Sequence, residues 1–436
     1  MNPINVGLVG VGTVGGGTVQ VLKKNAEEIS RRVGRDIRLL MASSKDLDAA
    51  KQICGDDVQI VADAFEVVRA KDIDIVVELI GGTTIAKELI LEAINHGKHV
   101  VTANKKLIAE YGNEIFSLAQ QKQVMVMFEA AVAGGIPIIK TLREGLAANN
   151  IEWIAGIING TSNFILTEMR DKGASFTDVL KEAQNLGYAE ADPTFDIEGN
   201  DAGHKITIMS ALAYGIPMQF DACSLEGISH LDGKDIKYAE ELGYRVKLLG
   251  ITRKTDQGIE LRVHPTLIPE SCLLANVNGV MNAVYVKGNV VGPTLSYGAG
   301  AGALPTASAV VADIIDIARL INTSPNNCVP YLAFKSDHIK NIPILPMEQI
   351  HSSYYLRICA KDEVGVLSEV TRLLAEQNIS IEAVIQKDAS NKQDAEIVIL
   401  THGTIEHNMN KAIENIEALS TTHGKVIRIR MEPFDA

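Results

Sequence analysis

Two hydrophobic patterns alternate along the first 130 residues of the chain. Short apolar runs of strand length occupy residues 4–9, 37–42, 74–79, 98–103 and 124–128. Apolar residues at helical spacing follow the first run and recur at 84–96 and 105–121. Strands that alternate with helices form a parallel sheet with helices on both faces. Residues 1–130 are therefore expected to be a doubly wound α/β domain of the Rossmann type, with ligands at the carboxyl ends of its strands.

The pattern changes after residue 130. Helices are expected at 137–146, 164–172, 177–186 and 200–214, and Ser175 with Asp178 forms a capping pair for the third. Strands are expected at 151–158, 245–252, 259–267, 283–287 and 290–295. This order indicates an α+β substrate and dimerisation domain over 131–304. Its largely antiparallel sheet could bury a partner subunit in a homodimer or homotetramer. Helix 305–320 is expected to return to the first domain.

The end of the chain contains a second break and a third domain. Asn322–Pro346 has four prolines and no clear periodicity, so residues 321–350 are expected to be an accessible linker. Beyond it, strands at 354–360, 379–386, 395–400 and 426–430 alternate with helices at 364–374 and 409–419. The order β-α-β-β-α-β predicts a small ferredoxin-like domain over 351–436.

Composition narrows the class of protein. With 436 residues the chain has room for two or three domains, and a net charge of −13 without a long basic run disfavours nucleic-acid binding. No apolar stretch reaches the roughly 18 residues of a membrane helix, and a strand begins too early for a signal peptide. Five scattered cysteines without C-x-x-C spacing favour a reducing compartment. We expect a cytoplasmic protein with neither nucleic-acid nor membrane partners.

The turn after the first strand is the first candidate site. It reads Gly10-Val11-Gly12-Thr13-Val14-Gly15, a G-x-G-x-x-G motif between a strand and a helix. Gly10 permits the tight bend, Gly12 lets the backbone approach a pyrophosphate, and Gly15 lets the helix pack on the strand. The helix N-terminus attracts phosphate through its N–H groups and dipole. The motif predicts a dinucleotide site; a purely structural Gly-rich turn is the alternative.

The end of the second strand distinguishes between two cofactors. NAD sites usually place Asp or Glu there, on the ribose 2′-hydroxyl. This chain has Ser43, Ser44 and Lys45 instead, which suit a 2′-phosphate better. The sequence therefore favours NADP, although Asp46 close by keeps NAD as an alternative and Lys45 could be an ordinary surface lysine.

Candidate acid–base groups lie on one helix and at one strand end. Asp201 and Lys205 are four residues apart and share a helix face, and Glu190 precedes them in a loop. Lys105 follows a strand at the cofactor edge. A partly buried lysine can act as an acid because its pKa falls readily, whereas an ordinary i,i+4 ion pair is the alternative. No cysteine lies where an acylating thiol is needed, so the pattern favours carbonyl–alcohol interconversion by hydride transfer.

Several motifs together resemble the monofunctional bacterial homoserine dehydrogenases. They are GLVGVGTVGGG, TANKKLIA, FEAAVAGGIPII, IINGTSNFIL, LGYAEADPTFDIEGNDAGHK and YGAGAGALPTA. The resemblance spans essentially the whole chain. It implies NAD(P)-dependent interconversion of L-aspartate 4-semialdehyde and L-homoserine, in threonine, methionine and isoleucine biosynthesis.

The resemblance also implies roles for individual residues. Lys205 is similar to the family's proton donor, and Lys105 to a second active-site lysine that also contacts the cofactor. Substrate-binding positions are matched by Glu190, Asp201, Asp196 and Thr161, and positions near the nicotinamide by Gly187 and Gly302. A sodium-like cation, held mostly by backbone carbonyls, is implied at Glu129, Val132, Gly134 and Ile136.

The tail resembles an ACT domain. Residues 362–367 match its first ligand loop, and Asn378 follows the helix as in that family. The resemblance implies feedback by an amino acid, with threonine as the expected effector at Asp362, Gly365 and Asn378. A dimerisation module that binds nothing is the alternative.

Two other classes of protein remain open from the residues alone. One is a non-catalytic dinucleotide sensor in which the ACT tail carries the function. The other is a dehydrogenase of a different amino acid, such as diaminopimelate or aspartate.

Overall fold

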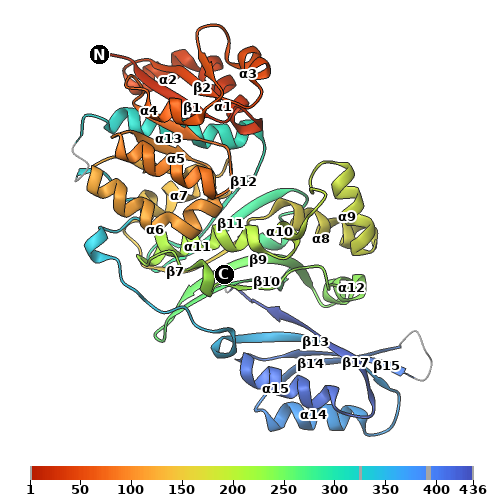
Figure 1. The fold of residues 1–436 in the computed structure, drawn as a ribbon. Coiled ribbons are helices and arrows are strands. Elements are labelled where there is room, and N and C mark those ends of the chain that lie inside the picture. The colour runs from red at the N-terminus through yellow and green to blue at the C-terminus, as the bar shows by residue number, and fades with distance from the viewer. Residues whose placement is uncertain (1, 324–326, 389–393, 435–436) are drawn as a thin grey trace. The chain divides into compact units, whose positions relative to one another are not determined.

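The computed structural model describes residues 2–323, 327–388 and 394–434 (Figure 1). The chain forms two compact units, each built from three separate segments. The first unit contains residues 1–160, 201–223 and 280–342, and the second contains residues 161–200, 224–279 and 343–436. These units differ from the linear domains expected from the sequence, because segments far apart in the chain pair in space.

A six-stranded parallel sheet organises the first unit. The strands follow the order β3-β2-β1-β4-β5-β6, and every pairing between neighbours is parallel. They are β1 (Ile4–Val9), β2 (Ile37–Ser43), β3 (Gln59–Val61), β4 (Ile75–Glu78), β5 (His99–Thr102) and β6 (Val126–Met127). The expected doubly wound sheet is confirmed. Its strand order reverses between β1 and β4, which places the ligand-binding crevice beyond the carboxyl end of β1.

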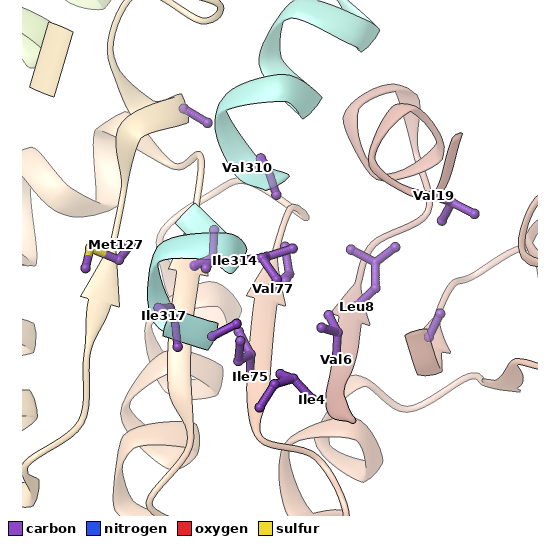
Figure 2. Close-up of a cluster of buried hydrophobic side chains, with 14 of the residues drawn as sticks. Ile4, Val6, Leu8, Val19, Ile75, Val77, Met127, Val310, Ile314 and Ile317 are labelled. Carbon is purple, nitrogen blue, oxygen red and sulfur yellow. The ribbon is translucent and has the colours of Figure 1, made fainter. Parts of the chain in front are cut away.

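Helices surround this sheet, and the last one returns from much later in the chain. They are α1 (Thr13–Lys24), α2 (Ala26–Val33), α3 (Leu47–Cys54), α4 (Ala64–Arg69), α5 (Thr84–Asn95), α6 (Lys105–Lys122) and α13 (Ala303–Leu320). Val310, Ile314 and Ile317 of α13 join the buried cluster that contains Ile75 and Val77 of β4 (Figure 2). Because β4 is buried, its first three residues are a continuous apolar run rather than an alternating pattern, and only Glu78 at its end is polar.

The rest of the first unit is a three-stranded antiparallel sheet, one long buried helix and short turns. The strands β7 (Ile151–Ile157), β11 (Met281–Gly288) and β12 (Gly292–Ala299) follow the order β12-β11-β7. Helix α11 (Asn200–Tyr214) is buried from Asp201 onward. The helix expected at 137–146 is instead α7 (Ile138–Lys140) followed by a π-helical turn, η2 (Thr141–Gly145). In the described part of this unit, 3-10 turns also occur at η1 (Glu129–Ala131), η3 (Phe220–Ala222) and η6 (Ser336–His338).

The second unit combines helices of the middle region with the C-terminal tail. Its helices are α8 (Gly160–Lys172), α9 (Phe176–Asn185), α10 (Thr194–Ile197), α12 (Gly233–Glu241), α14 (Val366–Glu376) and α15 (Glu406–Glu417). Its strands are β8 (Ser224–Leu225), β9 (Tyr244–Lys254), β10 (Ile259–Pro269), β13 (His351–Lys361), β14 (Ile381–Asp388), β15 (Asp394–Thr401), β16 (Thr404–Ile405) and β17 (Thr422–Met431). Short 3-10 turns occur at η4 (Leu273–Asn276) and η7 (Met347–Gln349).

The tail has the expected ferredoxin-like fold but does not stand apart. Its strands follow the order β17-β13-β15-β14, and α14 and α15 cover one face over a shared apolar cluster (Figure 1). Strand β17 also pairs in parallel with β10, where Thr266 faces Arg430 and Leu267 faces Met431. The tail sheet therefore continues into the β9–β10 hairpin, which covers an edge that would otherwise be exposed.

The segment expected to be an accessible linker is anchored at several of its described residues. Leu332, Leu345 and Ile350 are buried. The ring of Tyr331 stacks on Phe116, with 5.5 Å between centroids. The prolines interrupt helix and strand as expected, but apolar side chains between them still cover protein surface. Pro325 lies outside the described residues. No helix in the described part of the chain is long and apolar enough to cross a bilayer.

Candidate active site

The glycine-rich turn after β1 has the geometry of a dinucleotide site. Gly10 has a φ of 98°, and a Cβ there would lie 3.0 Å from the Leu79 carbonyl oxygen. A Cβ on Gly15 would lie 2.0 Å from the Gly10 carbonyl oxygen, so only glycine lets α1 approach β1 this closely. Beside Gly12 there is open space within 4 Å of where a side chain would begin. The turn therefore leaves room for a pyrophosphate at the N-terminus of α1.

A surface hollow of about 850 Å³ begins at this turn. Gly12 and Thr13 line one end of it, together with later residues of α1. Ala303, the first residue of α13, also lines the hollow, and Gly302 directly precedes it. Gly302, matched to a position near the nicotinamide, thus belongs to the same unit as the phosphate-binding turn.

A hydrogen-bond network at the ends of β4 and β5 positions Lys105. The buried Glu78 carboxylate accepts a bond from the Thr102 hydroxyl at 2.7 Å. Asn104 then caps α6, because its side-chain oxygen accepts a bond from the Leu107 N–H at 3.1 Å. Lys105 is the first residue of α6, so the cap fixes where its side chain leaves the edge of the sheet.

One buried carboxylate joins the two candidate lysines. In the first turn of α11, Asp201 Oδ2 accepts a bond from Lys205 Nζ at 2.7 Å, and Oδ1 lies 2.8 Å from Lys105 Nζ. Lys205 also donates to the Ile158 carbonyl oxygen at 2.6 Å. The Asn159 amide donates to Asp201 Oδ2 at 2.9 Å. The structure therefore brings α6, α11 and the residues after β7 together around Asp201.

The site is buried on one side and accessible on the other. The side chain of Lys205 is 10% exposed, and that of Lys105 is 34% exposed. Burial alone would raise the pKa of Asp201, but the ammonium groups of Lys205 and Lys105 outweigh burial and hold that pKa well below its usual range. Asp201 is therefore ionised and keeps both lysines in place. Such an arrangement suits a carbonyl oxygen that gains negative charge during reduction.

The end of β2 carries no carboxylate directed at a ribose. Ser43 is the last residue of β2 and is buried, whereas Lys45 is exposed. Asp46 caps α3, because its carboxylate accepts a bond from the Ala49 N–H at 3.0 Å. Because the Asp46 carboxylate is hydrogen-bonded to the N-terminus of α3, the alternative that Asp46 binds the 2′-hydroxyl of NAD is weakened.

The second unit gathers four expected site residues around one loop, namely Thr161, Gly187, Glu190 and Asp196. The Thr161 hydroxyl donates to the Tyr188 carbonyl oxygen at 2.6 Å. The Ser162 hydroxyl donates to the Asp196 carbonyl oxygen at 3.1 Å. The start of α8 thus holds the loop, and the exposed Glu190 carboxylate faces solvent.

The expected cation loop begins at Glu129, whose carboxylate is already used. Its two oxygens accept bonds from the N–H groups of Ile139 and Lys140, both at 2.8 Å. Burial raises the pKa of Glu129 to about 7 despite these bonds. Ala133 and Gly134 both have positive φ, so the backbone turns tightly. Among the described residues no group of three or more His, Cys, Asp or Glu side chains could hold a metal. The backbone carbonyl oxygens of this loop remain as possible ligands, and such hard oxygen ligands suit a monovalent cation.

The three expected effector residues do not form one site within a single chain. Asp362 and Gly365 precede α14, whereas Asn378 follows it. The helix has 11 residues and is therefore about 16 Å long, which exceeds the reach of one amino acid. Instead, Asp362 Oδ1 accepts a bond from the Gln386 side chain at 3.3 Å. The loop 362–365 and Asn378 lie at opposite ends of the helix.

A doubly wound sheet with a dinucleotide turn and two lysines joined by a buried carboxylate defines a nucleotide-dependent dehydrogenase. The family model of homoserine dehydrogenase matches residues 137–315, and that of its NAD-binding domain matches residues 10–129. An ACT domain model matches residues 354–421. The chain belongs to the homoserine dehydrogenase family and is an NAD(P)-dependent oxidoreductase, as the sequence motifs implied.

Individual relatives agree with this family over nearly the whole chain. Homoserine dehydrogenase of Neisseria gonorrhoeae is 67% identical over 432 residues, 99% of each chain. The crystal structure of a homoserine dehydrogenase from Thiobacillus denitrificans has a TM-score of 0.95 at 63% identity, covering 99% of each chain. A hyperthermophilic archaeal homoserine dehydrogenase in complex with NADPH has a TM-score of 0.62 at 29% identity, covering 74% of this chain and 99% of its own.

Sequence reasoning missed three groups that shape the site. Glu78 could have been noticed, since a carboxylate ends an otherwise apolar strand. Asn159 lies within a motif that the resemblance quoted, but its bond to Asp201 has no signal in the sequence. The Ile158 carbonyl is a backbone group, which residue type cannot indicate.

Proposed function

We propose that Lys205 donates the proton to the carbonyl oxygen of L-aspartate 4-semialdehyde as it is reduced to L-homoserine, with Lys105 assisting beside the cofactor. The observation that supports this is the shared buried carboxylate of Asp201, in the unit that also carries the dinucleotide turn. The bound nicotinamide supplies the hydride. Measuring semialdehyde reduction with NADPH tests the proposal, and a protein that binds NADPH without turnover would contradict it.

The remaining residues have separate proposed roles. Asp201 holds both ammonium groups in place, so that little reorganisation is needed when the carbonyl oxygen becomes basic. Because both its oxygens are engaged, Asp201 acts on the substrate through the lysines. Glu190 is proposed to bind the substrate ammonium and Asp196 to contact the substrate, while the Thr161 hydroxyl orders the loop that presents Glu190.

We further propose that the enzyme uses NADP(H) at least as well as NAD(H). Ser43 and Lys45 occupy the place where NAD enzymes usually have an acid, and Asp46 is used as a helix cap. The NADPH complex of the archaeal relative is consistent with this choice.

Lys45→Glu should weaken the binding of NADPH and leave the binding of NADH nearly unchanged. A hydrogen bond to a charged group contributes about 1.5–3 kcal/mol, so we expect KM for NADPH to rise about 10- to 100-fold while KM for NADH changes little. Lys51→Glu on α3 is the matched control, because Lys51 pairs with Asp56 at the surface. Equal losses for both cofactors, or a strong preference of the unaltered enzyme for NAD, would contradict the assignment.

We also propose a sodium-like cation at the loop that contains Glu129, Val132, Gly134 and Ile136. The tight backbone turn and the carbonyl oxygens of this loop support it. Because the Glu129 side chain caps α7, it would contribute its backbone carbonyl rather than its carboxylate.

The ACT tail is proposed to bind an amino-acid effector, with threonine as the candidate. The loop that contains Asp362 and Gly365 is the proposed contact, since a carboxylate and nearby backbone N–H groups can meet an amino acid's ammonium and carboxylate. Asn378 can join this site only from a second subunit. We therefore propose a homodimer or homotetramer, and the exposed side chains of Val290, Val291 and Tyr297 near β12 support a subunit contact. A cytoplasmic location is proposed separately.

Asp362→Ala should reduce inhibition by threonine without changing basal activity. Coupling between an effector site and an active site is typically about 1–3 kcal/mol, so the half-inhibiting threonine concentration should rise about 5- to 150-fold. Glu376→Ala, at an exposed position near the end of α14, is the control. Inhibition that survives Asp362→Ala would place the effector elsewhere, and an uninhibited full chain would leave the tail as an assembly module.

A further inference from the structure

A short connecting segment in the second unit, residues 226–235, runs from the end of β8 into α12. The C-terminal tail holds this connecting segment at its first end. The Glu226 carboxylate accepts a bond from Nη1 of Arg430, on β17, at 2.6 Å. Arg430 is buried and also donates from Nε to Glu406, at the start of α15, at 2.9 Å. One arginine of the tail sheet thus joins the segment to the tail's own helix.

The tail also holds the second end of the connecting segment. Asp235 is fully buried, and Arg357 of β13 binds it with two parallel bonds, Nε to Oδ1 at 2.6 Å and Nη2 to Oδ2 at 2.9 Å. The Tyr355 hydroxyl adds a third bond to Asp235 Oδ1 at 2.9 Å. Bidentate pairs of this kind fix direction as well as distance. The orientation of α12 therefore depends on the tail sheet.

The middle of the connecting segment packs on the end of the short helix α10, which carries Asp196. The Ile228 N–H donates to the Ile197 carbonyl oxygen at 2.8 Å. A Cβ on Gly227 would lie 2.5 Å from that same oxygen and 2.4 Å from Glu198 Oε2. Ile197 and Glu198 directly follow Asp196, so the backbone at Gly227 and Ile228 determines where the C-terminal end of α10 lies.

We propose that the connecting segment 226–235 couples the C-terminal tail to residues 194–199, which form α10 and the turn after it, and that Arg357 and Arg430 are positioning residues for substrate binding. This inference rests on the proposed substrate role of Asp196. A shift of the tail sheet moves Glu226 or Asp235, and the backbone between them then displaces Ile197 and its neighbours. The expected signature is a change in affinity for the amino-acid substrate, with affinity for NADPH unchanged.

The first test is steric and uses the full-length enzyme. Gly227→Ala forces the backbone at Ile197 to move. Mutations along such a connection typically change coupling by factors of about 2 to 30, so KM for the semialdehyde should rise within that range while KM for NADPH stays constant. Gly233→Ala is the matched control, because its Cβ would be no closer than 3.9 Å to Ala174. Equal KM values in both variants would overturn the proposal.

The second test is electrostatic and reports on the tail directly. Tyr355→Phe removes one bond to Asp235 and leaves the Arg357 pair, so the protein should fold and show a smaller rise in the same KM. Arg357→Met should show a larger rise, and Arg357→Lys a partial recovery. Arg372→Met, which breaks only the exposed pair with Glu376 on α14, should leave KM unchanged. Thermal unfolding of each variant separates this signature from loss of structure.

Asp196→Asn distinguishes a failure of the coupling from a failure of the proposed function. If Asp196→Asn raises KM for the semialdehyde and Gly227→Ala does not, the coupling is overturned and the role of Asp196 stands. If Asp196→Asn leaves KM unchanged, the substrate role of Asp196 is overturned, and the coupling with it. A rise in both variants supports both.

Discussion

Replacing Lys205 by alanine should lower kcat by about 10²- to 10⁴-fold, the usual contribution of a positioned general acid. Lys205 is the more buried of the two lysines, and Asp201 and the Ile158 carbonyl hold its ammonium group. Asp201 keeps bonds from Lys105 and Asn159 after the change, so the fold and the dinucleotide turn should survive. NADPH affinity, measured by fluorescence titration, should therefore remain nearly unaltered while turnover is lost.

Lys106→Ala is the matched control for this experiment. Lys106 lies next to Lys105 on α6 and is paired with Glu110 at the surface, 3.9 Å away. Its removal should change kcat little. If Lys205→Ala retained a near-normal kcat, Lys205 would have no part in proton transfer, and Lys105 would be the next candidate.

Glu432→Gln should destabilise the second unit by about 3–5 kcal/mol, the typical cost of removing one partner from a buried ion pair. Arg262 on β10 is fully buried, and its Nη2 donates to Glu432 at 2.6 Å and to Glu260 at 2.9 Å. Glu432 follows β17 and also accepts a bond from Arg253 at 2.9 Å. Neutralising Glu432 leaves the buried Arg262 charge with a single carboxylate.

Hydrogen exchange of β10 amides, with urea unfolding, measures this loss. Glu376→Gln, which breaks an exposed pair, should cost little. Burial would raise the pKa of Glu432, but Arg262 and Arg253 outweigh it and lower that pKa. A lowered pKa means that this stabilisation is present at neutral pH and disappears as the pH falls. Unchanged protection in Glu432→Gln would show that Glu260 alone compensates Arg262.

The sequence predicted the parts of the fold in which local pattern and burial agree. The buried strand β4 is apolar up to Glu78 at its end, and Ser175 caps α9 by accepting a bond from the Asp178 N–H at 3.2 Å. Helix α12 was missed because its polar sequence reads as solvated surface. The partners that bury Asp235 lie on β13, more than a hundred residues later, where no local pattern can reveal them.

The candidate site was predictable to the same degree. The spacing of Asp201 and Lys205 placed them on one helix face, and the structure has them bonded. The spacing of residues could not show that Lys105 binds the same carboxylate. Lys105 and Asp201 lie on two helices that are far apart in the sequence. Asn378 was grouped with Asp362 from motif positions alone, and only the length of α14 separates them.

The late return of α13 constrains how the chain is made. Its apolar face fills the same cluster as β1 and β4, so a nascent chain of some 130 residues lacks part of the core of its own nucleotide domain (Figure 2). Domains generally fold as units while synthesis proceeds at about 5–20 residues per second. In this chain the apolar face of the N-terminal sheet that α13 covers therefore stays exposed until Leu320 has left the ribosome. During that interval the emerging polypeptide exposes apolar strands, and chaperones that bind such surfaces have time to act.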